Sequence, residues 1–165
     1  MKNYLLSLLF LSFIAQCGLA QTVTNKRPNV LFIPVDGLGM KDLSRTGSTF
    51  HETPNVDRIA KEGTVFTQGY AACSVCSPSR ASIMTGKFAA RHGITDWIGA
   101  KSGTDWRTEK RNNKLLPADY VHALPKEDRV LPEVMKVNGY KTFSAGKWHL
   151  AEKGSYIRIN NCYYG

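Results

Sequence analysis

The sequence predicts an α/β fold with a mostly parallel sheet flanked by helices. Two observations carry this prediction. Apolar runs of strand length alternate along the chain with helical patterns, and glycines or Xaa-Pro pairs mark where those helices begin and end. The segments with strand character are 29–35, 64–70 and 140–145, and the helical patterns begin near positions 53, 77 and 131.

The first predicted strand, 29–35, is an apolar run interrupted only by Pro34, as expected of a buried parallel strand. A turn of sequence DGLG follows, so Asp36 is expected at the carboxyl end of the strand, where open α/β sheets bind ligands. The run 64–70 alternates in the manner of a second strand. The run 140–145 is followed by GKWH, which leaves the carboxyl end of a third.

The predicted helices have clear start and stop signals. Thr53 and Pro54 suit the N-cap and first helical position, and Gly63 ends the pattern after an apolar face has formed. The pair Leu131-Pro132 opens another helix, which Gly139 stops. The intervening segment 93–124 is long for a loop without structure, and such loops are usually functional or partly ordered.

The composition is basic. The chain carries 22 basic and 13 acidic residues, a net charge of +9, and much of this charge lies in 101–114. A basic surface suits polyanions, sulfated glycans included. The default interpretation of 101–114 is a solvated loop, and nucleic acid is not expected as a partner because the chain has no recognisable binding module and reads as exported.

The N-terminus predicts export. A basic Lys2 and an apolar run at 4–14 precede the small residues of GLA at 18–20, so residues 1–20 are expected to be a signal peptide cleaved after Ala20. The run is shorter than the roughly 20 residues of a membrane span, so stable membrane insertion is not expected. Lipoprotein anchoring at Cys17 is not expected because the bulky Gln16 precedes it. The mature chain, 21–165, would be periplasmic or extracellular.

Export leaves an odd number of cysteines, namely Cys73, Cys76 and Cys162. At least one thiol must therefore be free, modified or paired between molecules. The spacing of Cys73 and Cys76 also fits a redox pair or half of a zinc site. A second pair of zinc ligands at similar spacing does not follow.

The segment 76–86, of sequence CSPSRASIMTG, is the most informative. It places a thiol at a predicted helix N-terminus, whose unpaired N–H groups and positive dipole end favour anions. Arg80 follows one turn later and can bind an oxyanion with two N–H groups. Sulfate or phosphate chemistry fits this arrangement. The plainer alternative is a buried or disulfide-bonded cysteine beside an ordinary helix cap.

This segment, with the spacing C-x-P-S-R-x-x-x-x-T-G, resembles the signature of the sulfatase family. Further segments resemble the family in order: 28–36, 53–66, 91–94 and 139–150. The resemblance thus covers about 28–150. It implies the N-terminal part of a fold like that of alkaline phosphatase, and a reaction in which a sulfate ester is hydrolysed to an alcohol and inorganic sulfate.

The resemblance also implies roles for particular residues. A maturation enzyme would oxidise Cys76 to formylglycine, whose hydrate attacks sulfur and also binds a divalent cation, calcium in most relatives. Asp36 would be a ligand of that cation. Arg80 would hold the formylglycine hydroxyl, Lys147 would contact the hydrate and the sulfate, and His149 would remove a proton to release sulfate. The substrate would be a sulfated small molecule or a sulfated glycan.

Two departures from the family pattern change the expectation. Gly37 stands where relatives usually carry a second aspartate, which should weaken cation binding. The chain is also several times shorter than sulfatases, and its tail, 151–165, no longer resembles them. We therefore expect a truncated catalytic domain, with the tail a frameshifted or prematurely ended reading of a longer gene, and a poor or inactive catalyst.

Two other classes of function remain open at this point. One is a non-catalytic secreted protein that retains a sulfate- or glycan-binding pocket. The other is a phosphoryl-transfer hydrolase of the same superfamily that uses an unmodified side chain.

Overall fold

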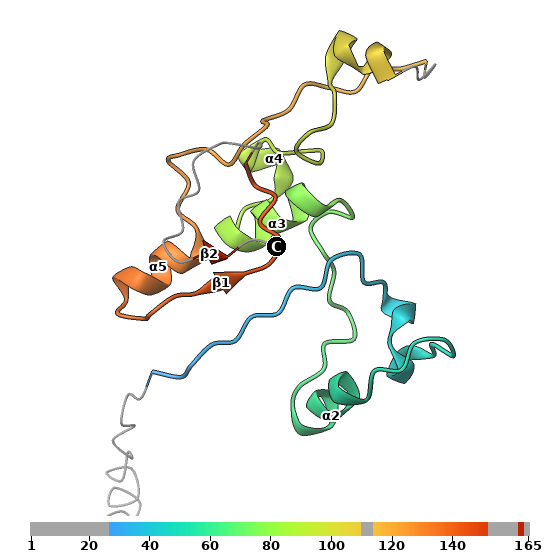
Figure 1. Cartoon of the computed structure of the whole chain (residues 1–165), viewed down its shortest axis with the longest axis vertical. Helices are drawn as coiled ribbons and strands as arrows, with labels where there is room; N and C mark the ends of the chain where they lie inside the picture. Colours follow the sequence, from blue (N-terminus) through green and yellow to red (C-terminus); the bar gives the residue numbers. More distant parts are fainter. Residues whose placement is uncertain (1–26, 110–113, 152–161, 164–165) are drawn as a thin grey trace, which may run out of the picture. The chain divides into compact units, whose positions relative to one another are not determined.

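The computed structural model describes residues 27–109, 114–151 and the backbone of 162–163 (Figure 1). The chain divides into two units, 1–34 and 35–165. In the first unit, the described residues 27–34 have neither helix nor strand. The predicted signal peptide and most of the divergent tail lie outside the described residues. In the described parts, no helix has both the length and the apolar character of a membrane span.

The second unit holds all the described helices and strands. The α-helices are α2 (Pro54–Glu62), α3 (Cys76–Thr85), α4 (Ala89–His92) and α5 (Leu131–Val137). The 3-10 helices are η1 (Met40–Asp42), η2 (Ser44–Thr46) and η3 (Gly103–Glu109), and the strands are β1 (Ser144–Ala145) and β2 (Cys162–Tyr163). The three helices expected from the sequence are therefore present as α2, α3 and α5.

The expected sheet is the part of the prediction that the described residues do not bear out. Residues 29–35 and 64–70 have no strand, and the predicted strand 140–145 is reduced to β1. β1 pairs in parallel with β2, with Ser144 opposite Cys162. A strand is held by backbone hydrogen bonds to a neighbouring strand, and the described residues offer none to 29–35 or 64–70. Within the described residues, the apolar runs alone therefore do not form the expected mostly parallel sheet.

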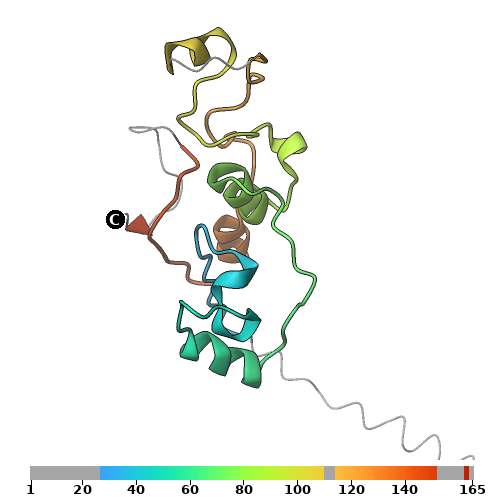
Figure 2. The same cartoon turned by 90° about the vertical axis from the view of Figure 1, so that its right-hand side faces the viewer.

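The core of the second unit surrounds α3. Ala81, Ile94, Ile98 and Leu150 form a buried apolar cluster, with Met84, Leu124 and Trp148 packed against it. α4 and α5 both contact α3, and α5 lies beside it in Figure 2. Four of the ten residues of α3 are buried. This helix, which carries the most informative sequence segment, is therefore the best anchored one.

A buried histidine ties α3 to the chain after α4. The Nε2 atom of His92 lies 3.1 Å from the hydroxyl of Ser82, and its Nδ1 accepts the backbone N–H of Ile94 at 3.1 Å. Since Nδ1 accepts, Nε2 carries the proton in the neutral ring and donates to Ser82. Burial lowers the pKa of His92 from 6.5, which favours this neutral form.

The long segment 93–124 is partly ordered, as the sequence suggested. It leaves α4, carries η3 and returns toward α5 (Figures 1 and 2). Backbone hydrogen bonds close it at two levels, from Val121 to Gly93 at 2.8 Å and from Gly103 to Pro117 at 3.1 Å. The described parts of the loop therefore have a defined conformation held by backbone hydrogen bonds.

Candidate active site

The site begins at the first turn of α3. Cys76 is the first residue of the helix, after an extended Val75 that supplies no side-chain cap. The first backbone N–H groups of the helix therefore face outward without an internal acceptor. Cys73 and Cys76 are both half-buried and free, so the redox-pair alternative has no disulfide between them. Arg80 follows Cys76 by one turn and lies on the same side of the helix.

Three residues from distant parts of the sequence meet beside this helix. One carboxylate oxygen of Asp36, Oδ2, lies 2.6 Å from the Nζ of Lys147, and the other, Oδ1, lies 3.5 Å from the Nη2 of Arg80. The Nη1 of Arg80 also donates to the backbone carbonyl of Lys147 at 2.6 Å. The structure thus brings together three of the residues singled out in the sequence.

The charges in this cluster are unbalanced. Two cations share one carboxylate, and the hydrogen bond from Lys147 is the main cause that lowers the pKa of Asp36 below 3.8. The side chain of Arg80 is only 12% exposed, and its Nε is buried with no hydrogen-bond partner among the described residues. A buried donor with no acceptor is costly. An oxyanion beside Arg80 would satisfy it.

His149 is held in an unusual backbone conformation. Its φ is +52°, the only positive value at a non-glycine residue in the described chain. Such outliers cost about 1–3 kcal/mol and concentrate at functional sites. The Nε2 of the ring lies 3.0 Å from the carbonyl oxygen of Ile98. Because a carbonyl can only accept, Nε2 carries the proton of the neutral ring, and the lone pair is on Nδ1. That nitrogen is buried and makes no hydrogen bond within the described structure.

Ile98 connects His149 to the start of α3. Its backbone N–H donates to the hydroxyl of Ser77 at 3.0 Å, while its carbonyl faces His149. Trp97, the preceding residue, has its ring 6.4 Å from that of His149. The sequence motifs did not predict Ser77, Ile98 and Trp97 as site residues. The one available signal was the Gly- and Trp-rich character of 93–124.

The residues present do not fit the expected calcium ion. Calcium takes six to eight oxygen ligands. Asp36 is the expected carboxylate ligand, and both of its oxygens face cationic side chains. In the described parts of the chain, no group of three or more His, Cys, Asp or Glu residues could hold a metal ion. Gly37, with φ +72°, contributes no carboxylate to the turn.

Comparison with known proteins decides the family. The sulfatase family model matches residues 28–155 of this chain. The chain belongs to the sulfatase family. The match includes the Cys76 segment and all three residues of the Asp36–Arg80–Lys147 cluster.

Curated sulfatases are similar over most of this sulfatase chain. N-acetylgalactosamine-6-sulfatase from Canis lupus familiaris is 32% identical over 92% of this chain and 29% of the relative. The human protein of the same name is 31% identical over 90% of this chain and 28% of the relative. Arylsulfatase G from Rattus norvegicus is 37% identical over 79% of this chain and 21% of the relative. The chain therefore spans less than a third of the length of these relatives.

Solved structures agree. The crystal structure of Ps i-CgsB matches with a TM-score of 0.55 and 28% identity, over 74% of this sulfatase chain and 24% of that chain. The structure of Ps i-CgsB in complex with k-i-k-neocarrahexaose matches with the same values. About three quarters of the chain thus share their fold with about a quarter, by length, of a larger relative.

Proposed function

We propose that this chain carries part of the catalytic site of a sulfatase that hydrolyses a sulfate ester, with Cys76 as the precursor of the nucleophile. The observation that supports it most is the cluster of Asp36, Arg80 and Lys147 beside α3. Two cations near a helix N-terminus suit the singly charged sulfate ester, its transition state and the doubly charged sulfate product. The partner that converts Cys76 to formylglycine would be a maturation enzyme met during export.

In the proposed reaction, one hydroxyl of the formylglycine hydrate attacks sulfur, and the S–O bond to the alcohol breaks. The alcohol leaves with a proton and the sulfate remains esterified to residue 76. The second hydroxyl then loses its proton, its oxygen forms the C=O bond, and inorganic sulfate is released. Water adds to the aldehyde to restore the hydrate. The described residues supply the charges and the proton acceptor for these steps.

Each described residue has a role that its contacts support. Arg80 can turn its unsatisfied Nε–H toward the hydrate or a sulfate oxygen. The ammonium of Lys147 shares the Asp36 carboxylate with the Arg80 guanidinium and can donate to sulfate. The Nδ1 of His149 has the lone pair that takes the proton of the second hydroxyl, while its Nε2–H stays anchored on Ile98.

The described donors do not form a cation site. A calcium ion bound by Asp36 would have to replace Lys147 at Oδ2 and find other oxygen ligands. We propose that calcium binding to this chain is weak until such ligands are supplied.

For the substrate we propose a sulfated glycan. The names of the relatives include an N-acetylgalactosamine-6-sulfatase, and a relative was crystallised with k-i-k-neocarrahexaose. The net charge of +9 suits a polyanionic substrate. A periplasmic or extracellular location, reached through residues 1–20, would give access to such polymers.

The test is to produce the 165-residue chain together with a formylglycine-generating enzyme and to analyse the peptide that contains both cysteines by mass spectrometry. We expect Cys76 to lose its sulfur while Cys73 keeps it, so Cys73→Ala is the matched control and Cys76→Ala the negative one. An intact Cys76, together with cleavage of an aryl phosphate in place of an aryl sulfate, would instead support a phosphoryl-transfer hydrolase.

A binding measurement tests the anion site separately from turnover. Inorganic sulfate, the expected product, should shift the NMR signal of the Arg80 Nε–H, and Lys147→Ala should weaken sulfate binding about tenfold, since it removes one of two charges. The matched control is Lys141→Ala, an exposed lysine away from the cluster. Equal sulfate affinity in both variants would contradict the proposed role of Lys147.

A further inference from the structure

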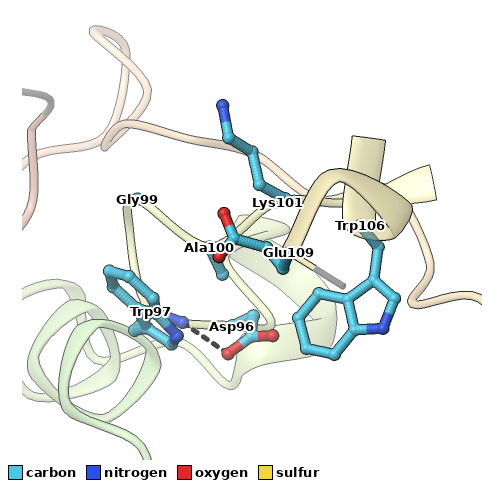
Figure 3. A pocket seen from close by; sticks show the side chains of 7 residues that line it. All are labelled: Asp96, Trp97, Gly99, Ala100, Lys101, Trp106 and Glu109. Atoms are coloured by element: carbon cyan, nitrogen blue, oxygen red, sulfur yellow. Dashed lines mark hydrogen bonds between the residues drawn. The ribbon is translucent and has the colours of Figure 1, made fainter. Parts of the chain in front are cut away.

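A pocket lies in the ordered loop that follows α4, outside the cluster around Asp36. It has a volume of about 260 Å³. Its lining residues come from the stretch 96–101 and from η3, namely Asp96, Trp97, Gly99, Ala100, Lys101, Trp106 and Glu109 (Figure 3). Pockets for drug-sized ligands measure about 300–1,000 Å³, so this smaller pocket has room for roughly one six-membered ring with its substituents.

The side chains of the pocket are arranged in a specific way. Trp97 and Trp106 stand at opposite ends, and the carboxylates of Asp96 and Glu109 lie between them (Figure 3). Lys101 extends its ammonium away from the other side chains that line the pocket (Figure 3). Indole rings offer flat apolar faces for stacking, and carboxylates accept hydrogen bonds from hydroxyl groups. A ligand with an apolar face and hydroxyl groups at its edge would use both.

The walls of the pocket are held before any ligand binds. The hydroxyl of Tyr120 lies 2.8 Å from the carbonyl of Trp97 and 2.9 Å from that of Ala100. Gly99 has φ +111°, and a Cβ there would come within 2.7 Å of the Trp97 ring. Only glycine at position 99 therefore leaves room for the Trp97 indole to lie against the backbone there. A preformed pocket loses less entropy on binding.

The pocket is coupled to the candidate active site through Ile98. Its backbone N–H donates to the hydroxyl of Ser77 at the start of α3, and its carbonyl oxygen accepts from the Nε2 of His149. The ring of Trp97, which lines the pocket, lies 6.4 Å from the His149 ring at an angle of 46°. Trp97 therefore contributes both to the pocket and to the surroundings of His149, the group that takes the proton in the proposed reaction.

We propose that this pocket binds one pyranose ring of a glycan substrate. This inference rests on the proposed sulfatase function and adds the place where the sugar is held. The ring would stack its C–H face on an indole and donate hydroxyl hydrogen bonds to Asp96 and Glu109. Exposed basic side chains on the same loop, those of Lys101 and Arg107, would attract the anionic remainder of the polymer.

The chain contains three tryptophans, which makes the test direct. Trp97 and Trp106 line the pocket, whereas Trp148 packs against the core. Titration of the full chain with neoagarohexaose, an unsulfated galactose-based oligosaccharide, should shift the indole N–H signals of the first two tryptophans and leave that of Trp148 unmoved. Trp106→Ala should weaken binding at least about fivefold, and Trp106→Phe should restore part of it. Phe88→Ala, which removes an exposed aromatic ring outside the pocket, is the matched control.

The outcomes separate this inference from the function on which it rests. An unsulfated probe can bind but cannot be hydrolysed as a sulfate ester. If the chain binds this saccharide but hydrolyses no sulfate ester, the pocket assignment stands and the proposed reaction is refuted. Sulfate hydrolysis without shifts at Trp97 and Trp106 would overturn the pocket alone. Shifts caused by tetramethylammonium and not by the oligosaccharide would also overturn it, because two indoles and two carboxylates can enclose a cation.

Discussion

Helices α2 and α3 are equally well signalled in the sequence and very differently placed in the structure. Both begin near a proline and end at the residue before a glycine. Yet α2 has no buried residue, and its Ile59 is 64% exposed, whereas α3 buries four. Local signals thus determine where a helix forms, but a covering partner decides whether it contributes to a core.

The difference extends to the polar contacts around each helix. Near α2, Ser44 bonds the side chains of Thr53 and Asp57 in a local, part-buried network. At α3, the hydroxyl of Ser77 is fully buried and takes a hydrogen bond from a residue 21 positions away. The second kind of contact organises tertiary structure, because it joins segments that are far apart in the sequence.

The largest expected difference comes from matched isoleucine truncations. Ile94→Ala should lower the free energy of unfolding by about 2–5 kcal/mol, because Ile94 is fully buried and its loss leaves a cavity. Ile59→Ala in α2 should change it by no more than about 0.5 kcal/mol. Urea unfolding of both variants measures the two values. Equal losses would show that α2 is covered in solution.

Matched serine substitutions should give a smaller difference. Ser77→Ala should cost about 1–3 kcal/mol, since it leaves the N–H of Ile98 buried and unsatisfied. Ser44→Ala should cost about 1 kcal/mol or less because water can reach the part-buried groups. The same unfolding measurement applies, and a larger cost at Ser44 would reverse the order proposed for the two regions.

The two regions should also respond differently to pH. Burial lowers the pKa of His92 in the folded chain, so the unfolded chain takes up a proton first as the pH falls. Stability from this residue is complete above about pH 6.5 and is lost as the pH falls from there toward the folded-state pKa. Nearby Asp128 opposes this shift and Lys87 adds to it. Between pH 7 and 5 the free energy of unfolding should fall less steeply in His92→Gln than in the unaltered chain. The control His51→Gln, near α2, should keep the slope of the unaltered chain.

The smallest effect on stability is expected at the ion cluster. Asp36 is exposed, and pairs of this kind contribute about 0–1 kcal/mol. Its lowered pKa contributes stability above about pH 3.8, and this is lost as the pH falls through the folded-state value. NMR titration of the carboxyl carbon should show the pKa of Asp36 rising in Lys147→Ala and unchanged in Lys141→Ala. An unchanged pKa in Lys147→Ala would mean that the pair does not form in solution.

Part of the candidate site was predictable and part was not. The sequence motifs identified Asp36, Arg80 and Lys147, and the structure joins these three within one cluster. Ser77, Ile98 and the tryptophan pocket had no comparable signal. Their roles depend on backbone groups and on ring positions, which follow from how the loop after α4 folds back, and a one-dimensional pattern does not encode that path.

By itself, the sequence determined the family, the helices α2, α3 and α5, and the identity of the charged residues of the site, because prolines, glycines and motif spacing act locally. Only the tertiary structure decided which apolar segments are buried, that the runs 29–35 and 64–70 have no strand partner among the described residues, and that His149 keeps its lone pair on Nδ1. These properties depend on which segments lie next to each other, since burial and hydrogen bonding are properties of pairs of segments.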